Sequence, residues 1–267
     1  MQLESIIFAL FFVCTTYTFI YSYSILPSPS SVIATAYDIR KMETPRFFLT
    51  EDDEQGALIR WTPDVPNWED PWSMLLGSGK TEYLYLRPDY ANGNTNGTFH
   101  WITDENVARQ NAKSFYPYTE GIEADLPYLY FVCKNDYRMF RLNLDDQTFD
   151  YISTRGGLFD GQPDQIRSVL QNDGSKMIYF SEDYGRTAGI HARDEDGNFY
   201  TILEGAEYSV ETAGISFSPD GKRMYFAYQD DGWFFEVTRD DGQSFYGKTV
   251  NLKPKHEENP AKFRKAR

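Results

Sequence analysis

Apolar, mostly aromatic residues alternate with polar ones in short runs along the chain, the pattern typical of β-strands. Five such runs end in a short polar or acidic segment, which we call the acidic step: FFLTEDD at 47–53, YLYLRPD at 83–89, YLYFVCKND at 128–136, MIYFSEDYG at 177–185 and MYFAYQDDG at 224–232. The last apolar residues of their cores are spaced by 37, 45, 49 and 46 residues: Leu49, Leu86, Phe131, Phe180 and Phe226. A spacing of about 44 residues is the length of one four-stranded propeller blade. The pattern therefore predicts an all-β, propeller-like body over 38–252 with about five blade repeats, as a closed ring or an arc of a larger one.

The connections between the runs carry hairpin signals. Asp-Gly pairs at 196–197, 220–221, 231–232 and 241–242 predict type I′ turns between strands. Helical periodicity is weak outside the N-terminal segment and residues 104–113.

Residues 1–37 differ from the rest, because Ser5–Tyr37 carries no charge. One interpretation is a signal peptide with an apolar core at Ile6–Cys14 and an A-x-A pattern at Ala34–Ala36. The other is a membrane-anchoring hydrophobic helix over Ser5–Leu26, followed by a Pro/Ser linker. Both predict the secretory pathway and an extracellular or membrane-anchored body, in contact with the membrane if the leader is uncleaved. The sequon Asn96-Gly97-Thr98 in a Gly/Asn-rich loop agrees with passage through the secretory pathway and makes Asn96 a glycosylation candidate.

Charge and composition narrow the partners. The 26 Lys and Arg against 40 Asp and Glu give a net charge of −14, although the short tail 253–267 is basic. An acidic body repels nucleic acid and attracts metal cations. With two scattered Cys and three His, a metal here should be a hard cation held by oxygen. Cys133 is expected to be an unpaired, half-buried strand thiol.

The acidic steps recur once per repeat, so they can converge on the channel face of a propeller. Converging carboxylates would supply the six to eight oxygens that calcium takes. For any one Asp the simpler interpretation is a capped turn or solvated loop, but Glu120 and Glu211 each lie beside small or apolar residues and a glycine. The candidates are Glu51, Asp52, Glu120, Asp164, Glu182, Asp183 and Glu211.

Three polar residues near strand ends are candidates for binding an anionic substrate. Lys134 and Gln229 occupy equivalent repeat positions, three after Phe131 and Phe226, and Arg138 lies nearby. Such strand-end side chains usually face solvent, which is the alternative. His191, in an alternating strand, is expected to be structural.

These stretches resemble the PhoX-type alkaline phosphatase family, and more closely its eukaryotic algal relatives. The matching segments span roughly 45–252: FFLTEDDEQGALIRWTPD, FYPYTEGIE, LYFVCK, FDGQPDQI, YFSEDYGRTAGIHARD and ETAGISFSPDGKRMYFAYQDDGWFFEVTRDDGQSF. The last run is the most specific, because common propeller repeats share only its SPDG turn.

The resemblance implies a six-bladed propeller phosphomonoesterase, exported, with calcium and iron at the channel mouth and one Cys ligating iron. It makes Glu120, Glu182 and Glu211 the expected metal ligands, with Asp183 and Asp164 as the next candidates. The family's Trp-Gly-Thr…Cys-Glu-Glu run has no counterpart here, so the chain corresponds to the C-terminal part of such a protein, and full activity is in doubt.

The first expectation is therefore an exported, PhoX-like, metal-binding propeller that hydrolyses small phosphate monoesters. Two alternatives stay open from the sequence. One is a calcium-dependent lactonase-type propeller hydrolase, and the other is a non-catalytic surface binding module.

Overall fold

The protein is described by a computed structural model that covers residues 32–155, 159, 161–170, 176–184, 188–204 and 211–245. The predicted N-terminal helix and the basic tail 253–267 lie outside these residues. Strands dominate, and two short α-helices and one 3-10 turn interrupt them: α2 (Ser73–Leu76), η1 (Tyr90–Asn92) and α3 (Glu105–Phe115). The all-β prediction is confirmed, and so is the helix expected over 104–113, which Asp104 caps by accepting a hydrogen bond from the Val107 amide.

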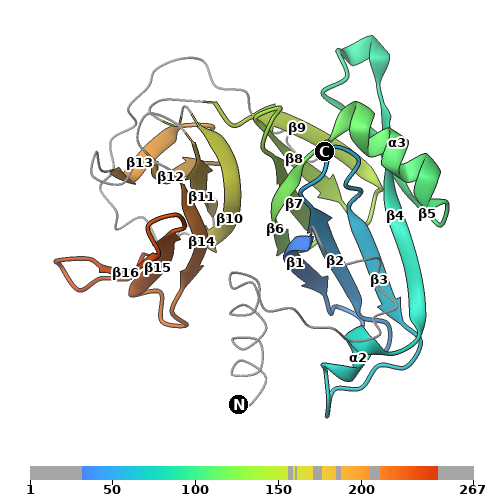
Figure 1. The fold of residues 1–267 in the computed structure, drawn as a ribbon, viewed down its shortest axis with the longest axis horizontal. Coiled ribbons are helices and arrows are strands. Elements are labelled where there is room, and N and C mark those ends of the chain that lie inside the picture. The colour runs from blue at the N-terminus through green and yellow to red at the C-terminus, as the bar shows by residue number, and fades with distance from the viewer. Residues whose placement is uncertain are drawn as a thin grey trace.

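The strands form four antiparallel sets, which we call blades 1 to 4 (Figure 1). Blade 1 holds β1 (Val32–Asp38), β2 (Arg46–Glu51), β3 (Ile59–Pro63) and β4 (Gly79–Pro88). Blade 2 holds β6 (Thr119–Asp125), β7 (Tyr128–Cys133), β8 (Arg138–Asn143) and β9 (Thr148–Ser153). Blade 3 holds β10 (Gln162–Leu170), β11 (Lys176–Asp183), β12 (Gly189–Asp194) and β13 (Phe199–Glu204). Blade 4 holds β14 (Thr212–Phe217), β15 (Arg223–Tyr228) and β16 (Trp233–Thr238).

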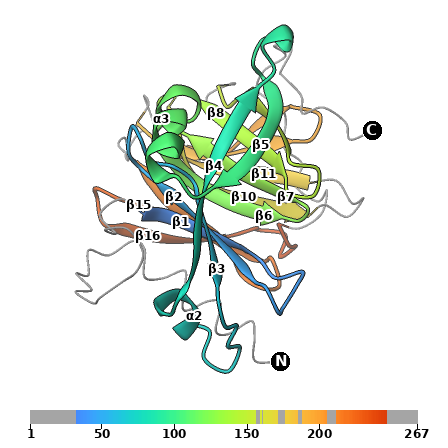
Figure 2. The same cartoon turned by 90° about the vertical axis from the view of Figure 1, so that its right-hand side faces the viewer.

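One further strand, β5 (Asn96–Ile102), joins the first two blades. It pairs with β4 on one side and with β9 on the other, so blades 1 and 2 share a single nine-stranded sheet. Helix α3 follows β5 and packs against β4 (Figure 2).

The number of repeats differs from the sequence prediction. Leu49, Phe131, Phe180 and Phe226 all lie in the second strand of a blade, whereas Leu86 lies in β4, the fourth strand of blade 1. The run 83–89 looked like a repeat because β4 is long and aromatic, like a second strand. The described residues therefore make four blades of a propeller-like fold, and the prediction of about five is wrong in this respect.

The folded body also begins earlier than the predicted boundary at residue 38. Strand β1 starts at Val32, and Ala34 and Ala36 of the A-x-A pattern are buried against the core of blade 1. Cleavage after Ala36 would remove five of the seven residues of this strand. Among the described residues, no helix is long and apolar enough to cross a membrane.

The four Asp-Gly turns occur where they were predicted, but their type differs. Gly197, Gly221, Gly232 and Gly242 all have positive φ, between 66° and 88°, whereas the preceding aspartates do not. Each of these glycine amides donates to the carbonyl three residues earlier. This is a type I turn followed by a left-handed glycine, not the type I′ turn, which needs positive φ at both central residues.

Aromatic side chains pack between blades and within them. Tyr179 of blade 3 meets Phe217 of blade 4 edge to face, with ring centroids 5.1 Å apart. The four second-strand anchors are buried, and Phe131 stacks on Phe140 with ring centroids 4.8 Å apart. Phe226 stacks in the same way on Phe235, at 5.3 Å. Each fully buried ring of this size contributes about 1.5–3 kcal/mol to the free energy of unfolding.

The innermost strands β1, β6, β10 and β14 lie side by side in that order. Each carries a β-bulge near its first residues, where two residues of the innermost strand face one of the second strand. In blade 2 the bulge contains Glu120 and Gly121, and in blade 3 it contains Asp164 and Gln165. Bulges redirect side chains and are frequent beside functional sites.

Gly121 allows blades 2 and 3 to approach each other. A Cβ atom at this position would lie 2.6 Å from the Ile166 nitrogen and 2.7 Å from the Asp164 oxygen, both backbone atoms. Such contacts can be relieved only by moving β10 away from β6.

We predict that Gly121→Ala lowers the free energy of unfolding by about 1–3 kcal/mol, because the added methyl group forces the two strands apart. Urea unfolding followed by circular dichroism measures the change. Gly77→Ala is the matched control, since its Cβ would meet only the Ser73 oxygen, at 3.1 Å. An equal effect of the two substitutions would contradict this account of the blade contact.

Candidate functional site

The end of the second strand places one polar side chain from each blade at the same structural position. Asp52, Lys134, Asp183 and Gln229 each stand three residues after the buried anchor of their blade. In an antiparallel blade this position lies beside the first residues of the innermost strand, where the bulges are. Side chains from four distant parts of the sequence are therefore brought to one end of the fold.

Lys134 is the centre of this group. Its Nζ lies 2.7 Å from Asp52 Oδ2, 2.8 Å from Glu120 Oε1 and 3.7 Å from Asp183 Oδ2. These partners belong to blades 1, 2 and 3, so one ammonium group offsets carboxylates from three blades. The Glu120 and Asp183 side chains are only 5% and 6% exposed, whereas Lys134 is 20% exposed.

Two further carboxylates complete the group, and we name the five acids together the carboxylate cluster: Asp52, Glu120, Asp164, Asp183 and Glu211. Asp164 accepts hydrogen bonds from Ser181 Oγ at 3.1 Å and from Gln165 Nε2 at 3.3 Å. Glu211 forms an isolated backbone bridge with Asp183 and accepts a hydrogen bond from Gln229 Nε2 at 3.0 Å.

Not every carboxylate oxygen of the cluster has a partner. Asp52 Oδ1 and Asp183 Oδ1 are both buried and accept no hydrogen bond. An unpaired buried oxygen of this kind costs about 1–3 kcal/mol. The Asp183 side chain is more than nine-tenths buried, and its other oxygen faces Lys134, so the free oxygen belongs to the cluster.

Burial and mutual repulsion shift the cluster toward its protonated forms. Burial, followed by the charges of Asp164 and Asp52, raises the pKa of Glu120 to about 9. Burial, with the charges of Asp183 and Asp164, raises the pKa of Glu211 to about 8. Burial raises the pKa of Asp164 to about 7 and also raises that of Asp183. Such shifts are typical of groups that need a cation nearby to ionise.

The sequence candidates divide between this cluster and other places. Glu120, Asp164, Asp183 and Glu211 come together as predicted, with Asp52. Glu51 instead pairs with Arg109 of α3, at 2.9 Å.

Glu182 is also separate from the cluster. Successive side chains of a strand point to opposite faces, so the Glu182 side chain lies on the opposite face of β11 to that of Asp183. Its side chain is fully buried, with Oε1 accepting from the Gly161 amide at 2.6 Å and Oε2 lying 3.1 Å from His191 Nε2. On the other side of the ring, His191 Nδ1 lies 3.2 Å from Thr201 Oγ1. Glu182 and His191 thus form an internal pair of blade 3, in keeping with the structural role expected of His191.

Of the three predicted anion-binding residues, Lys134 and Gln229 lie at the cluster. Arg138 instead contacts Asp136 at 3.0 Å, the Phe115 carbonyl at 3.3 Å and the face of Tyr151. Asn96 is the first residue of β5 rather than part of a loop, and it is 9% exposed. A glycan on its buried Nδ2 would therefore have to be attached before β5 pairs.

Cys133 is an unpaired thiol in β7, as predicted, and it is fully buried where a half-buried side chain was expected. Burial raises its pKa well above the usual range, and its side chain belongs to the core formed by blades 1 and 2. It therefore does not offer a thiolate to the cluster, and the donors there are oxygens, as hard cations prefer.

Sequence reasoning named Lys134 as an anion-binding residue, whereas the structure shows it as the counter-ion of three carboxylates. It missed Ser181, which donates a hydrogen bond to Asp164. Aligning all four second strands places Asp52 and Asp183 at the repeat position of Lys134, but it does not show that their side chains meet.

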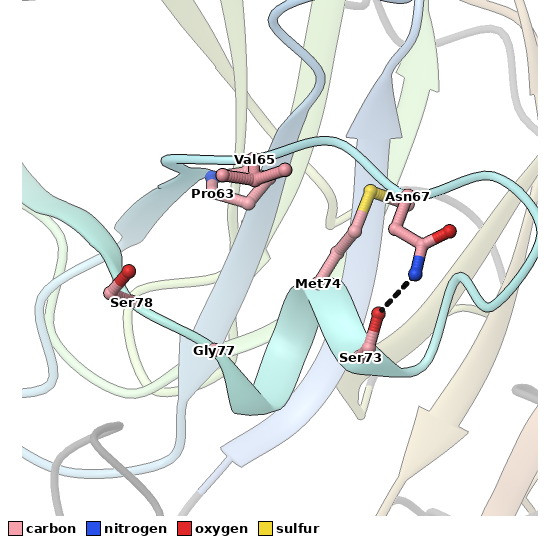
Figure 3. Close-up of a pocket in the computed structure, with 7 residues that line it drawn as sticks. All are labelled: Pro63, Val65, Asn67, Ser73, Met74, Gly77 and Ser78. Atoms are coloured by element: carbon pink, nitrogen blue, oxygen red, sulfur yellow. Dashed lines mark hydrogen bonds between the residues drawn. The ribbon is translucent and has the colours of Figure 1, made fainter.

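A pocket lies at the opposite end of blade 1, in the β3–β4 connection (Figure 3). Pro63, Val65, Met74 and Gly77 line it together with Asn67, whose Nδ2 donates to Ser73 Oγ at 3.2 Å. No charged side chain lines this pocket, so we do not place the candidate site there.

The fold and the cluster together define a class, that of propeller-like proteins with acidic side chains gathered at one end of the blades. Within the described ranges, no three His, Cys, Asp or Glu side chains are arranged to hold a metal ion directly. The position between Asp52, Glu120 and Asp183 is instead taken by the Lys134 ammonium.

Comparison with solved structures agrees with the propeller-like fold. The chain is similar to Pseudomonas fluorescens PhoX in complex with vanadate, a transition state analogue, with a TM-score of 0.55 and 14% identity over 79% of this chain and 53% of that one. It thus spans about half of that protein's length. It is also similar to a putative 6-phosphogluconolactonase from Bacteroides uniformis, with a TM-score of 0.46 and 13% identity over 87% of this chain and 72% of that one. No protein-family model and no curated protein matches the sequence. The likeness to PhoX therefore supports a PhoX-like propeller fold.

Replacing the most strongly perturbed acid should change the pH dependence of stability. The folded-state pKa of Glu120, about 9, lies above its usual value of 4.5, so stability falls as pH rises through this interval. Glu120→Gln removes this loss. We predict that the variant gains at least about 1 kcal/mol over the wild type at pH 8 and little at pH 4, measured by thermal unfolding across pH. A constant difference across pH would contradict the assignment.

Removing one member of the internal pair should be costly. We predict that Glu182→Ala lowers the free energy of unfolding by about 2–4 kcal/mol, because the buried Gly161 amide and His191 lose their hydrogen-bond partner and the removed side chain leaves a cavity. Glu236→Ala is the control, since its ion pair with Arg223 is exposed and contributes about 0–1 kcal/mol. Chemical denaturation of both variants checks the prediction, and similar losses in the two would refute it.

Proposed function

We propose that this chain is a PhoX-like propeller protein that binds a hard divalent cation, calcium, at the carboxylate cluster. One observation carries the proposal. Five carboxylates from four blades converge, and Asp52 and Asp183 each retain a buried oxygen without a partner. Oxygen ligands from several segments, some of them carboxylate, are the set that calcium takes.

The donor set fits calcium better than iron. The cluster supplies carboxylates, and the Gln229 side chain, which already contacts Glu211, adds an amide oxygen within the same end of the blades. The cysteine ligand that the family resemblance implies has no equivalent in the described residues, because Cys133 is enclosed in the core. Our proposal therefore leaves iron out.

The activity that we propose is hydrolysis of small phosphate monoesters. Bound calcium would supply positive charge to offset that of the phosphate oxygens and of the transition state. Among the described residues, Lys134 and Gln229 are donors in contact with the cluster, and they would orient a phosphate group. The PhoX-like fold supports this activity, and an uncharged Ser5–Tyr37 segment supports export as part of the proposal.

A non-catalytic binding module is the second candidate. Trp233 and Phe234 of β16 are each 58% exposed, on the outermost strand described for blade 4. Exposed aromatic rings on a strand edge are typical of surfaces that bind other molecules. In that case calcium would stabilise the module without turnover.

The proposal is tested by calorimetric titration of the full chain with calcium and by p-nitrophenyl phosphate turnover with and without calcium. We predict that the wild type binds calcium and that Glu211→Gln or Asp183→Asn weakens binding about tenfold or more, with a parallel loss of turnover. Asp125→Asn is the matched control, because Asp125 lies at the far end of β6 from Glu120.

Calcium binding without phosphate turnover would favour the binding module, and turnover of a lactone alone would favour the lactonase alternative. Absence of calcium binding in the wild type would refute the cation site.

A further inference from the structure

We infer that Lys134 is a tethered competitor of the metal ion: its ammonium group occupies the cation position of the carboxylate cluster, and a bound divalent cation must displace it. This inference rests on the proposed cation site and adds the element that sets its affinity.

The first argument is the contact geometry. Lys134 Nζ is in direct contact with Asp52 and Glu120, at 2.7 and 2.8 Å, and lies 3.7 Å from Asp183. Calcium–oxygen distances are about 2.3–2.6 Å, so a calcium ion held by these same oxygens would occupy the volume of the ammonium. The two cations therefore exclude each other.

The second argument is the repeat position. The equivalent residues of the other three blades are Asp52, Asp183 and Gln229, all of which carry a side-chain oxygen. Lys134 alone places a positive charge where the other blades place an oxygen donor. The carboxylate cluster thus contains one unit of positive charge from this chain. Without that charge, the cluster would attract an external cation more strongly.

The third argument is that the side chain can leave while its backbone stays. The Lys134 amide donates to the Tyr118 carbonyl at 3.1 Å, and the Lys134 carbonyl accepts from the Tyr137 amide at 3.1 Å. The backbone is therefore fixed in the β7–β8 turn. The side chain itself is 20% exposed, so its four-carbon stem can move the ammonium toward solvent.

The fourth argument is that the ammonium does not satisfy the site completely. Asp183 is paired with Lys134 only at 3.7 Å, and its buried Oδ1 has no partner. A divalent ion, which takes more oxygen ligands than an ammonium can contact, would use this oxygen as well.

The test compares calcium affinities of the full-length wild type, Lys134→Met and Lys134→Arg by isothermal titration calorimetry with calcium chloride. Methionine keeps the length of the stem and removes the charge, whereas arginine keeps the charge. We expect Lys134→Met to bind calcium about tenfold or more tightly than the wild type, and Lys134→Arg to remain within about threefold of it.

Lys176→Met is the matched control, and we expect its calcium affinity to equal that of the wild type. Lys176 also forms an ion pair with a strand carboxylate, Asp125, but at the opposite ends of β11 and β6 from the cluster.

Thermal unfolding gives a second readout that does not depend on calorimetry. Without calcium, Lys134→Met should unfold at a lower temperature than the wild type, because Asp52, Glu120 and Asp183 lose their counter-ion. With calcium its unfolding temperature should rise by more than that of the wild type. If Lys134→Met does not fold, Lys134→Gln, which reproduces the residue of blade 4, is measured instead.

The outcomes separate the two proposals. Wild-type binding with equal or weaker binding by Lys134→Met would overturn the role of Lys134 and leave the cation site in place. No calcium binding by any variant would overturn the cation site itself. Tighter binding by the variant that lacks the charge, with both controls unchanged, would support the inference.

Discussion

Repulsion among five carboxylates is the constraint that shapes one whole end of this protein. Asp52, Glu120, Asp164, Asp183 and Glu211 come from all four blades, and burial makes each negative charge more costly than it would be in water. The Lys134 ammonium offsets part of that cost by direct contact with two of them and by proximity to a third. The raised pKa values of Glu120, Asp164 and Glu211 reflect the part of this cost that Lys134 does not offset.

The blades can bring these charges together because their backbones repeat one geometry. The innermost strands each contain a bulge near their first residues, and in blades 2 and 3 the bulges contain Glu120 and Asp164. Gly121 allows β6 and β10 to approach closely enough for the two acids to interact. Buried apolar clusters rich in aromatic rings join neighbouring blades and support this arrangement. The acids are thus held by the same packing that holds the fold.

Much of the fold could be predicted from the sequence, because the period-2 alternation and the aromatic content are local signals. The anchors Leu49, Phe131, Phe180 and Phe226 were predicted correctly, since each lies in the second strand of a blade. Leu86 was misassigned because strand length and aromatic content do not distinguish the second strand of a blade from the fourth. The Asp-Gly turns were found, but their type was not, since it depends on the φ of the aspartate.

The site could be predicted in part for a similar reason. Convergence of the acidic steps follows from the repeat and leads to Asp52 and Asp183 at the ends of second strands. Glu120 and Glu211 could be found from the small residues and glycines beside them, and Asp164 from the family resemblance. The direction of a single side chain could not be predicted from the sequence. Glu182, one residue before Asp183, points instead toward His191 inside blade 3. The counter-ion role of Lys134 depends on three partners far apart in sequence, at 52, 120 and 183, which no local pattern reveals.

The most direct measurement is an anomalous-scattering map of crystals of the full chain soaked in terbium chloride, since terbium replaces calcium and is located without ambiguity. The account predicts a peak bounded by Asp52, Glu120 and Asp183, with the Lys134 side chain turned away from these carboxylates. A peak elsewhere on the surface, or no peak while Lys134 keeps its ion pairs with Asp52 and Glu120, would contradict it.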